Sequence, residues 1–471
     1  MRSAGHRDPR RYDGPADRRE VAVQPAARST RARTSTRTCL ASSRTLCPPT
    51  SRNRRSPTER SSLRSGIVAA APGGGSLRLA MVIQRFRPSF GGQGVQVESL
   101  CAALAQRGVR STVFTAMPEK GAPEEERFDG YDVRRISTDL RGQWGHWPSF
   151  GARTYRALRA HHPDLVHVHG VTDGLYGSWL YCRRAQRPLV FEMALMGVDD
   201  PDAMDANPAA LRWLRKRMYR GADAYVAMSR AFEPSYARAG LPAERFHVIP
   251  QGVDLARFTP ADTATAARAR HQLGLADVGL VVAFVGSLIE RKGIDVLLRA
   301  WPEVRRSSPS AQLLLAGPGS PDEPAAAAAW AELSEADQDS VVMSGRVDAI
   351  EVASQAADVF AFPTRREGFG TVIVEAMAAG LPCVVAELPG ITDFIYAHPA
   401  PGIDAVGAQT DGIVVPQDSP EVLARTLGGL LADTNLRSTI GAAARQRARW
   451  FDIGGIADAY VELYSQLGGQ P

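Results

Sequence analysis

From Leu77 onward the chain alternates short apolar runs with longer amphipathic segments. Apolar runs of this length predict buried strands, and apolar positions at helical spacing predict helices. The glycine-rich segment 91–108 predicts a turn and then a helix that stops at Gly108. Alternating strands and helices predict a parallel sheet covered on both faces. In the first half we expect strands at LRLAMVIQRF (77–86), STVFTA (111–116), PDLVHVHG (163–170), RPLVFEMA (187–194), ADAYVAMS (222–229) and FHVIPQG (246–252).

The same pattern restarts in the second half of the chain. The loop between Gln251 and Asp262 separates the two patterns and is the expected hinge. The predicted fold class is therefore α/β, with two doubly wound domains at 77–255 and 256–455, and a closing segment, 456–471, that returns to the first domain. The expected strands are 280–286, 311–317, 340–345, 357–364, 382–387 and 411–416, and the expected helices are 293–306, about 325–334, 349–356, 371–379, 420–432, 435–449 and 456–467.

Charge separates the first 76 residues from the rest. They contain 16 arginines, no lysine and five acidic residues, so their charge is 16 − 5 = +11, and the rest of the +6 chain carries 6 − 11 = −5. A segment rich in Arg, Ser, Thr and Pro with few aliphatic residues is typical of disorder. We expect a non-functional extension, with a transit peptide or a basic arm for membrane or nucleic acid as alternatives. The mildly acidic remainder does not favour nucleic-acid binding.

Cysteine usage and hydropathy indicate the cellular compartment in which the protein is expected. The five cysteines form no CxxC pair, so we expect neither a disulfide framework nor a zinc site, and a reducing compartment fits. No apolar run reaches the ~18 residues of a membrane helix. We therefore expect a cytoplasmic protein, with the inner face of the membrane as a further location.

The segment REGFGTVIVEAMAAGLP carries the first candidate chemistry, because it follows a predicted strand and places two carboxylates around a Gly-Phe-Gly turn. Gly368 and Gly370 allow close approach of a ligand to the backbone. The free N–H groups of a helix starting near Thr371 suit a diphosphate. Glu375 lies about four residues into that helix and could accept two ribose hydroxyls, while Glu367 could meet sugar hydroxyls. The alternative is a solvated Glu367 and a Glu375 that pairs with an arginine.

In each half, the loop after the first strand carries a further candidate segment. Lys292 is one of only three lysines, and with Arg291 beside it suits a phosphate group. Alone this lysine would fit a surface charge next to a helix better, but beside the glutamate-glycine loop a phosphate contact is favoured. The turn GGQG, which includes Gly92, nearly matches a dinucleotide fingerprint, but Val97 stands where the third small residue belongs. This turn could let a phosphate or an acceptor approach the backbone.

Histidines end one of the predicted strands. His167 and His169 alternate, so they share one face of the strand. We expect the inner one to be a hydrogen-bonded core residue and His169, at the tip, to reach the ligand; a core role for both is the alternative. The acidic stretch DDPDAMD (199–205) contains a DxD spelling, which we interpret as helix-start acidity rather than a metal site. The basic stretch 211–220 fits a solvated helix face or contact with an anionic membrane.

Together these segments resemble family 4 of the retaining glycosyltransferases, also called glycosyltransferase group 1. The similarity runs through nearly all of 77–471, and its most specific part is the E-x7-E segment with its Ala-Met-Ala-Ala-Gly-Leu-Pro continuation. The matching segments are GGQGVQVESLCAALAQRG, PDLVHVHG, ADAYVAMS, VIPQGVDLARFTP, FVGSLIERKGIDVLLRA, AADVFAFPTRREGFGTVIVEAMAAGLPCVVAELPGITDFI and DGIVVPQDSPEVLA.

The resemblance implies a GT-B fold, in which two Rossmann-like domains face each other across a cleft. The C-terminal domain would hold a nucleotide-diphosphate sugar and the N-terminal domain an acceptor, such as a glycan, a lipid-linked sugar or a small metabolite. The implied roles are ribose binding by Glu375, sugar binding by Glu367, diphosphate binding by Lys292 with Arg291 and by Gly92, base binding by Arg346 and Val347, phosphate or sugar contacts along Gly368, Phe369, Gly370, Thr371 and 390–392, and a place near the reacting sugar for His169.

The implied reaction retains anomeric configuration by front-face attack, with no protein nucleophile, no cofactor and no metal ion. Three departures from the family pattern concern Ser287, where many members have Arg, Glu192 and Met193, where many carry a His, and the stretch 396–410, which looks longer than usual. A sugar-nucleotide epimerase or phosphorylase of the same fold is the main rival. A nicotinamide oxidoreductase leaves both glutamates without a role, and a non-catalytic binding protein would depend on the basic tail.

Overall fold

The computed structural model describes residues 77–88, 91–118, 122–137, 146–171, 174–206, 209–319, 324–347, 349–395 and 410–468. The predicted basic tail, 1–76, lies outside these residues, as does nearly all of the stretch that we expected to be unusually long, 396–410. All elements below belong to one compact unit.

The first half forms an eight-stranded sheet in the order β3-β4-β2-β1-β5-β6-β7-β8. All its described neighbours pair in parallel except β3 and β4, so the predicted doubly wound arrangement is confirmed. The strands are β1 (Leu79–Ile83), β2 (Ser111–Ala116), β3 (Glu125–Phe128), β4 (Tyr131–Ile136), β5 (Leu165–His169), β6 (Leu189–Met193), β7 (Ala224–Ala227) and β8 (Phe246–Val248). The helices between them are α1 (Gly92–Ala105), α2 (His146–His161), α3 (Gly174–Ala185), α4 (Ala209–Tyr219) and α5 (Glu233–Arg238), with short 3-10 turns at η1 (Pro201–Ala206), η2 (Arg230–Phe232) and η3 (Ala243–Arg245).

The expectation of a purely parallel sheet is wrong at one edge. Strands β3 and β4 form an antiparallel hairpin in which Phe128 pairs with Tyr131, so its loop is the two-residue turn Asp129-Gly130. Gly130 has φ +85°, a conformation that glycine adopts without strain. An Asp-Gly pair between two alternating segments is a strong hairpin signal that could have identified both strands from the sequence.

The second half forms a six-stranded sheet in the order β11-β10-β9-β12-β13-β14, in which all described neighbours pair in parallel. Counted from its own first strand this is the order 3-2-1-4-5-6 of dinucleotide-binding folds. The strands are β9 (Val281–Val285), β10 (Gln312–Ala316), β11 (Val341–Gly345), β12 (Val359–Phe362), β13 (Cys383–Ala386) and β14 (Ile413–Val415). The helices are α6 (Thr263–Leu273), α7 (Ile294–Ser307), α8 (Pro324–Ala331), α9 (Glu335–Gln338), α10 (Ile350–Ala356), α11 (Thr371–Ala378), α12 (Pro420–Ala432), α13 (Thr434–Ala448) and α14 (Ile453–Gln466), with 3-10 turns at η4 (Glu290–Lys292) and η6 (Arg449–Phe451).

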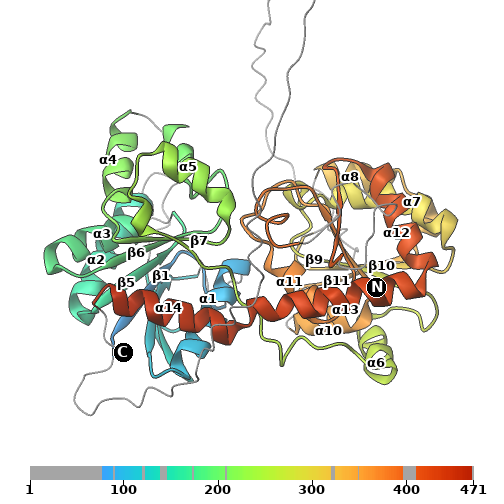
Figure 1. Ribbon diagram of the computed structural model, residues 1–471, viewed down its shortest axis with the longest axis horizontal. Helices are drawn as coiled ribbons and strands as arrows, with labels where there is room; N and C mark the ends of the chain where they lie inside the picture. Colours follow the sequence, from blue (N-terminus) through green and yellow to red (C-terminus); the bar gives the residue numbers. More distant parts are fainter. Residues whose placement is uncertain are drawn as a thin grey trace, which may run out of the picture. The chain divides into compact units, whose positions relative to one another are not determined.

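The chain passes between the two sheets twice, and the two passages pair with each other. The backbone N–H of Val253, in the predicted hinge, donates to the carbonyl of Phe451 at 2.7 Å, and that of Ile453 donates back to the carbonyl of Val253 at 3.0 Å. A side chain at Gly252 would lie 2.8 Å from the Cα of Ile453, so only glycine fits there. The closing helix α14 then packs beside α1 in the core of the first half (Figure 1).

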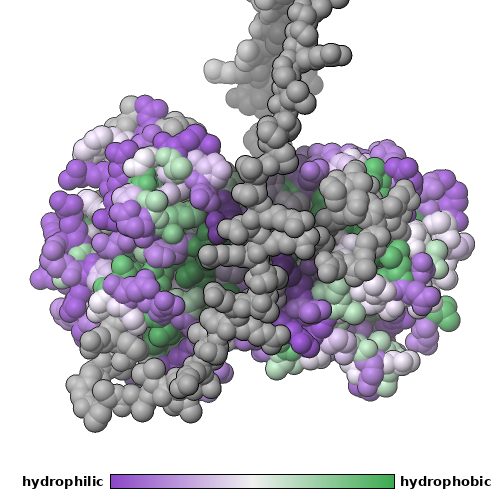
Figure 2. All heavy atoms as spheres, in the orientation of Figure 1, coloured by the Kyte–Doolittle hydropathy of each residue, from purple (hydrophilic) through white to green (hydrophobic). Residues whose placement is uncertain are grey.

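Strand burial explains why the apolar runs identified both sheets. Both central strands β1 and β9 are buried along their full length, as expected for strands covered on both faces. In the view of Figure 2, hydrophilic side chains cover most of the described surface, and hydrophobic ones form separate small areas. Among the described residues, no helix combines the length and apolar character that a membrane span requires.

Candidate functional site

Two loops meet where the strand order of the second sheet reverses, between β9 and β12. Ligands of doubly wound sheets bind beyond the carboxyl ends of the strands at such a point. The backbone N–H of Arg365 donates to the carbonyl of Arg291 at 2.9 Å, which ties the loop after β12 to the loop after β9. Gly293 has φ +72°, and a side chain there would lie 1.9 Å from the carbonyl oxygen of Pro363. Glycine is thus required for this close approach.

The paired loops bring together Arg291, Lys292 and Glu367, three of the residues predicted from the sequence. The Lys292 ammonium forms an ion pair with Glu367 Oε1, and Arg291 Nη1 lies 3.4 Å from the same oxygen. The Lys292 nitrogen also lies 4.9 Å from the centre of the Phe362 ring. Burial lowers the pKa of Lys292, while the Glu367 charge opposes that shift. Two cations and a carboxylate therefore converge in a partly dehydrated position, where their fields on an anionic ligand are strong.

An ion-pair network around the buried Asp295 supports this loop, and sequence reasoning missed it. Arg365 binds both oxygens of Asp295 at 2.7 and 2.8 Å, and its Nε donates to Asp418 at 2.6 Å. Asp295 is 3% exposed at the start of α7, and it also accepts from Arg299 at 3.0 Å. Bidentate pairing of this kind holds a loop in a defined geometry. From the sequence alone, Arg365 could not be distinguished from its neighbour Arg366 as the arginine that binds Asp295.

Glu375 lies in the first turns of α11, behind Gly370, which has φ +81° and begins the helix without a side-chain cap. Its carboxylate is buried, and its Oε2 has no hydrogen-bond partner among the described residues. Burial raises the pKa of Glu375 to about 7, with Arg257 lowering it and Glu351 raising it further. A buried acceptor without a partner is costly in a folded protein. It is therefore suited to receive hydroxyl donors from a ligand.

The Gly-Phe-Gly turn packs tightly against the first half of the chain. A side chain at Gly368 would lie 1.8 Å from the carbonyl oxygen of Ala194, and the Gly368 carbonyl accepts from Ser229 at 3.4 Å. Phe369 is 2% exposed and packs against Phe394 at 4.7 Å between ring centres. The Phe369 side chain thus belongs to the core, so only the backbone of this residue is available to a ligand.

The remaining predicted donor residues lie around this turn and after β11. The Thr371 hydroxyl binds the side chain of Gln251 in the hinge. Gly390 has φ +93°, and a side chain there would lie 2.8 Å from the Gly368 carbonyl oxygen, so the second predicted phosphate loop adjoins the first. Arg346 is exposed directly after β11, and Val347 packs against the core of the second half.

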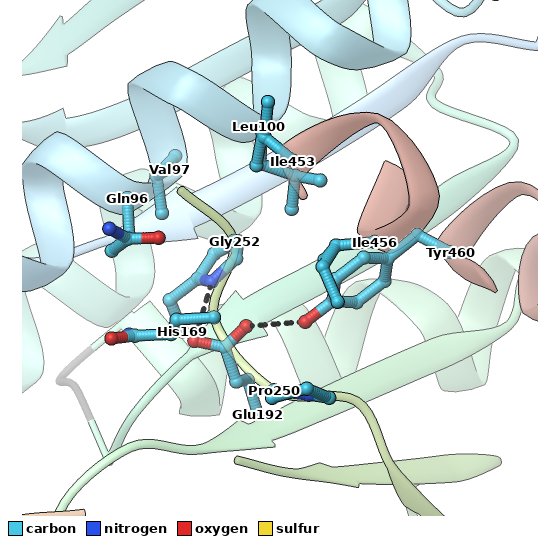
Figure 3. Close-up of a pocket in the computed structure, with 11 residues that line it drawn as sticks. Gln96, Val97, Leu100, His169, Glu192, Pro250, Gly252, Ile453, Ile456 and Tyr460 are labelled. Atoms are coloured by element: carbon cyan, nitrogen blue, oxygen red, sulfur yellow. Dashed lines mark hydrogen bonds and ion pairs between the residues drawn. The ribbon is translucent and has the colours of Figure 1, made fainter. Parts of the chain in front are cut away.

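The first sheet has its own reversal of strand order, between β1 and β5, and two predicted residues flank it. Gly92 begins α1, and a side chain there would meet nothing within 4 Å. His169 ends β5 and, with Gln96, Glu192 and Tyr460, lines a small cavity (Figure 3). The structure thus places His169 at the edge where a ligand of this half would bind.

Both histidines of β5 are fully buried on one face, with ring centres 4.1 Å apart. His167 Nδ1 lies 2.8 Å from the Tyr464 hydroxyl, so the inner histidine is a hydrogen-bonded core residue as expected. Burial and the neighbouring His169 hold the pKa of His167 well below its usual value. Among the described residues, the group His167, His169 and Glu192 is also the one whose ligand atoms lie close enough together to hold a metal ion.

The acidic stretch 199–205 is built around backbone contacts. Asp200 accepts from the N–H groups of Gly197 and Ala203, which fits its expected role at the start of η1. Asp199 accepts from three N–H groups, those of Val171, Ala194 and Leu195, at 2.7 to 3.0 Å. Burial raises the pKa of Asp199 to about 6. These carboxylates organise the loops at the end of β5 and β6.

Comparisons of the sequence and of the fold with known proteins both find glycosyltransferases. Residues 90–257 match the family described as Glycosyltransferase Family 4, and residues 279–433 match Glycosyl transferases group 1. The D-inositol 3-phosphate glycosyltransferase of Kineococcus radiotolerans is 34% identical over 404 residues, covering 79% of this chain and 90% of that protein. The enzyme of the same name from Salinispora arenicola is 31% identical over 410 residues, covering 81% and 89%.

Solved structures share the arrangement of both halves. Sucrose-phosphate synthase from Thermosynechococcus elongatus superposes with a TM-score of 0.66 at 24% identity, covering 83% of this chain and 99% of that one. Anabaena HepE in complex with UDP-glucose superposes with a TM-score of 0.64 at 22% identity, covering 83% and 100%. At these identities the likeness shows the fold alone.

Proposed function

The chain belongs to the family 4, group 1 glycosyltransferases and has their GT-B fold, and from this premise we propose the reaction that it catalyses. The protein moves a hexose-type sugar from a nucleotide-diphosphate sugar to a hydroxyl group of an acceptor. The anomeric configuration is retained, and neither a metal ion nor a cofactor takes part.

The observation that carries this proposal is the arrangement around the start of α11. Glu375 offers a buried Oε2 without a described partner, and Arg291 and Lys292 converge on Glu367, which precedes the helix. Between them lies an uncapped helix start, whose N–H groups favour an anion. A nucleotide-diphosphate sugar supplies what each part needs, namely ribose hydroxyls, a diphosphate and sugar hydroxyls.

Charge stabilisation replaces covalent catalysis in this site. As the bond between sugar and diphosphate breaks, negative charge grows on the leaving phosphate. Lys292, Arg291 and the positive end of α11 stabilise that charge, and because they are held before the reaction they need no reorganisation. Glu367 keeps the two cations in place and offers oxygens to sugar hydroxyls. The acceptor hydroxyl loses its proton to the leaving phosphate, so no protein nucleophile is required.

The acceptor binds in the first half, near His169 and the turn at Gly92. Relatives of this chain are named for D-inositol 3-phosphate, which makes a phosphorylated polyol one acceptor to test. Glycans and lipid-linked sugars are the other classes.

The test uses the full chain with UDP-, GDP- and ADP-sugars, with and without D-inositol 3-phosphate, while free nucleotide diphosphate is measured. We expect turnover of one donor in the wild type and loss of it in Glu375→Ala and Lys292→Ala. Glu303→Ala is a matched control, because Glu303 is half exposed on α7 and pairs only with Arg306 among the described residues. Proton NMR of the product decides retention. Nucleotide release without a glycosylated product would favour the epimerase or phosphorylase, and no turnover or binding of any donor would refute the assignment.

Helix α4 carries a second proposal, contact with the inner face of an anionic membrane. Trp213 is 64% exposed, and Lys216 and Arg217 lie one turn further along the same face, with the Arg217 guanidinium 5.8 Å from the Trp213 ring. An exposed aromatic between basic side chains suits a headgroup region. The check is co-sedimentation with vesicles of anionic or neutral phospholipid. We expect binding only to the anionic ones, reduced in Trp213→Ser. Recovery with neither would leave α4 a solvated face, and equal recovery with both would refute a role for its basic side chains.

A further inference from the structure

We propose that Glu192 is a positioning residue for His169, and that Tyr460 of the last helix holds Glu192 in place. The carboxylate fixes which nitrogen of His169 carries the proton and so presents the other nitrogen to a sugar hydroxyl. This inference rests on the proposed function, because it assigns His169 a contact with donor or acceptor sugar.

Strand pairing places the two side chains together. His169 and Glu192 are direct partners in the parallel pair β5 and β6, so their side chains leave the sheet on the same face. His169 Nδ1 lies 3.1 Å from Glu192 Oε1, and both side chains are almost fully buried. Glu192 and Met193 stand where many members of the family carry a histidine. The pairing of His169 with Glu192 is therefore a feature of this chain and does not follow from the family pattern.

The chemistry of the pair determines the tautomer. A carboxylate accepts hydrogen bonds, so Glu192 Oε1 at 3.1 Å favours the tautomer of His169 that carries its proton on Nδ1. The other nitrogen, Nε2, then carries a lone pair. Both ring nitrogens of His169 are buried without an aligned hydrogen bond among the described residues, although Nδ1 lies 3.1 Å from Glu192 Oε1, and the ring lines the small cavity of Figure 3. A hydroxyl of a bound sugar would satisfy Nε2.

Helix α14 completes the arrangement from the other end of the chain. The Tyr460 hydroxyl donates to Glu192 Oε2 at 3.0 Å, across 268 positions of sequence (Figure 3). Burial, together with the Glu192 charge, raises the pKa of Tyr460 well above its usual value, so the phenol keeps its proton and donates. One oxygen of Glu192 thus accepts from Tyr460 and the other lies 3.1 Å from His169 Nδ1, which restricts rotation of the carboxylate.

The other groups that face His169 do not compete for this role. His167 is neutral and directs its Nδ1 to Tyr464, and its Nε2 lies 3.7 Å from Glu192. Asp199 is occupied by three backbone N–H groups.

The kinetic test compares Glu192→Leu and Glu192→Gln in the full chain, with the donor and acceptor that the wild type uses. Leucine removes the acceptor, and we expect kcat to fall about 10–100-fold with an unchanged KM for the donor. Glutamine can still accept from His169 with its oxygen and donate to Tyr460, so it should recover most of kcat. Tyr464→Phe is the matched control on the same helix and should keep kcat. Equal loss in both Glu192 variants, or none in either, would overturn the proposal, as would loss of wild-type activity in EDTA restored by Zn²⁺.

A second measurement separates this inference from the proposed function. In protein labelled with ¹⁵N-histidine, the ring shifts of His169 report which nitrogen is protonated, whether or not a donor is known. We expect protonated Nδ1 in the wild type and in Glu192→Gln, and protonated Nε2 in Glu192→Leu, with thermal unfolding confirming that all variants fold. Protonated Nε2 in the wild type would refute the positioning role even if sugar transfer is found. An inactive wild type with protonated Nδ1 would instead refute only the proposed function.

Discussion

Replacing Glu375 by glutamine tests the buried carboxylate at the centre of the proposed donor site. Burial raises its pKa from 4.5 to about 7. In the unfolded chain the group ionises at its ordinary value, so the folded state holds the proton more tightly. The stability that this proton contributes is fully present below pH 4.5 and is lost as the pH rises through about 7. A difference of about 2.5 pKa units corresponds to about 3 kcal/mol at 1.36 kcal/mol per unit.

Glutamine is neutral at every pH and lacks this dependence. We therefore expect the free energy of unfolding of Glu375→Gln, relative to the wild type, to increase by roughly 2–3 kcal/mol between pH 5 and pH 8. Urea unfolding of both proteins at both pH values gives this difference, and other titrating groups cancel in it. Glu303→Gln, at a half-exposed position of α7, should show no such change.

An equal difference at pH 5 and pH 8 would refute the reasoning, because it would mean that the Glu375 carboxylate is not buried as a free acceptor. The same variant also checks the ligand. If ribose hydroxyls bind the ionised carboxylate, a saturating nucleotide diphosphate should raise the stability of the wild type more at pH 8 than at pH 5. In Glu375→Gln that difference should be smaller.

Three further predictions follow from the same site. Lys292→Ala should lower kcat/KM for the donor about 100-fold, because one cation that stabilises the leaving phosphate is lost, and steady-state kinetics with Lys292→Arg should show partial recovery; full activity in Lys292→Ala would contradict the role. Gly368→Ala should destabilise the protein by about 1–3 kcal/mol in thermal or urea unfolding, since its side chain would lie 1.8 Å from the carbonyl oxygen of Ala194; an unchanged midpoint would show that the turn does not pack there. EDTA should leave the transfer rate within about twofold, because Lys292, Arg291 and the start of α11 supply the positive charge; a metal requirement would show that they do not suffice.

Much of the candidate site could be predicted because its signals are local. Gly368 and Gly370 mark a turn, and a carboxylate inside an apolar helix requires a partner. The rule that ligands bind after the strands of a doubly wound sheet then groups Arg291, Lys292 and Glu367, and the structure brings these three side chains into contact.

Other parts depended on distant contacts. The bidentate pair of Arg365 and Asp295 and the bond from Tyr460 to Glu192 join residues 70 and 268 positions apart. Nothing in the spacing of either pair distinguishes it from a solvated charge. The hairpin β3–β4 is different, because its Asp-Gly turn was present in the sequence and was overlooked.

The sequence alone determined the two doubly wound halves and the candidate donor residues, because strand burial, helix periodicity and glycine turns act over a few neighbours. The tertiary structure decided which carboxylates are free and which are engaged. Glu375 keeps an oxygen without a described partner, whereas Glu192 accepts from Tyr460 on the last helix and lies 3.1 Å from His169 on β5. That distinction depends on burial and on pairing across the whole chain, which only the folded arrangement provides.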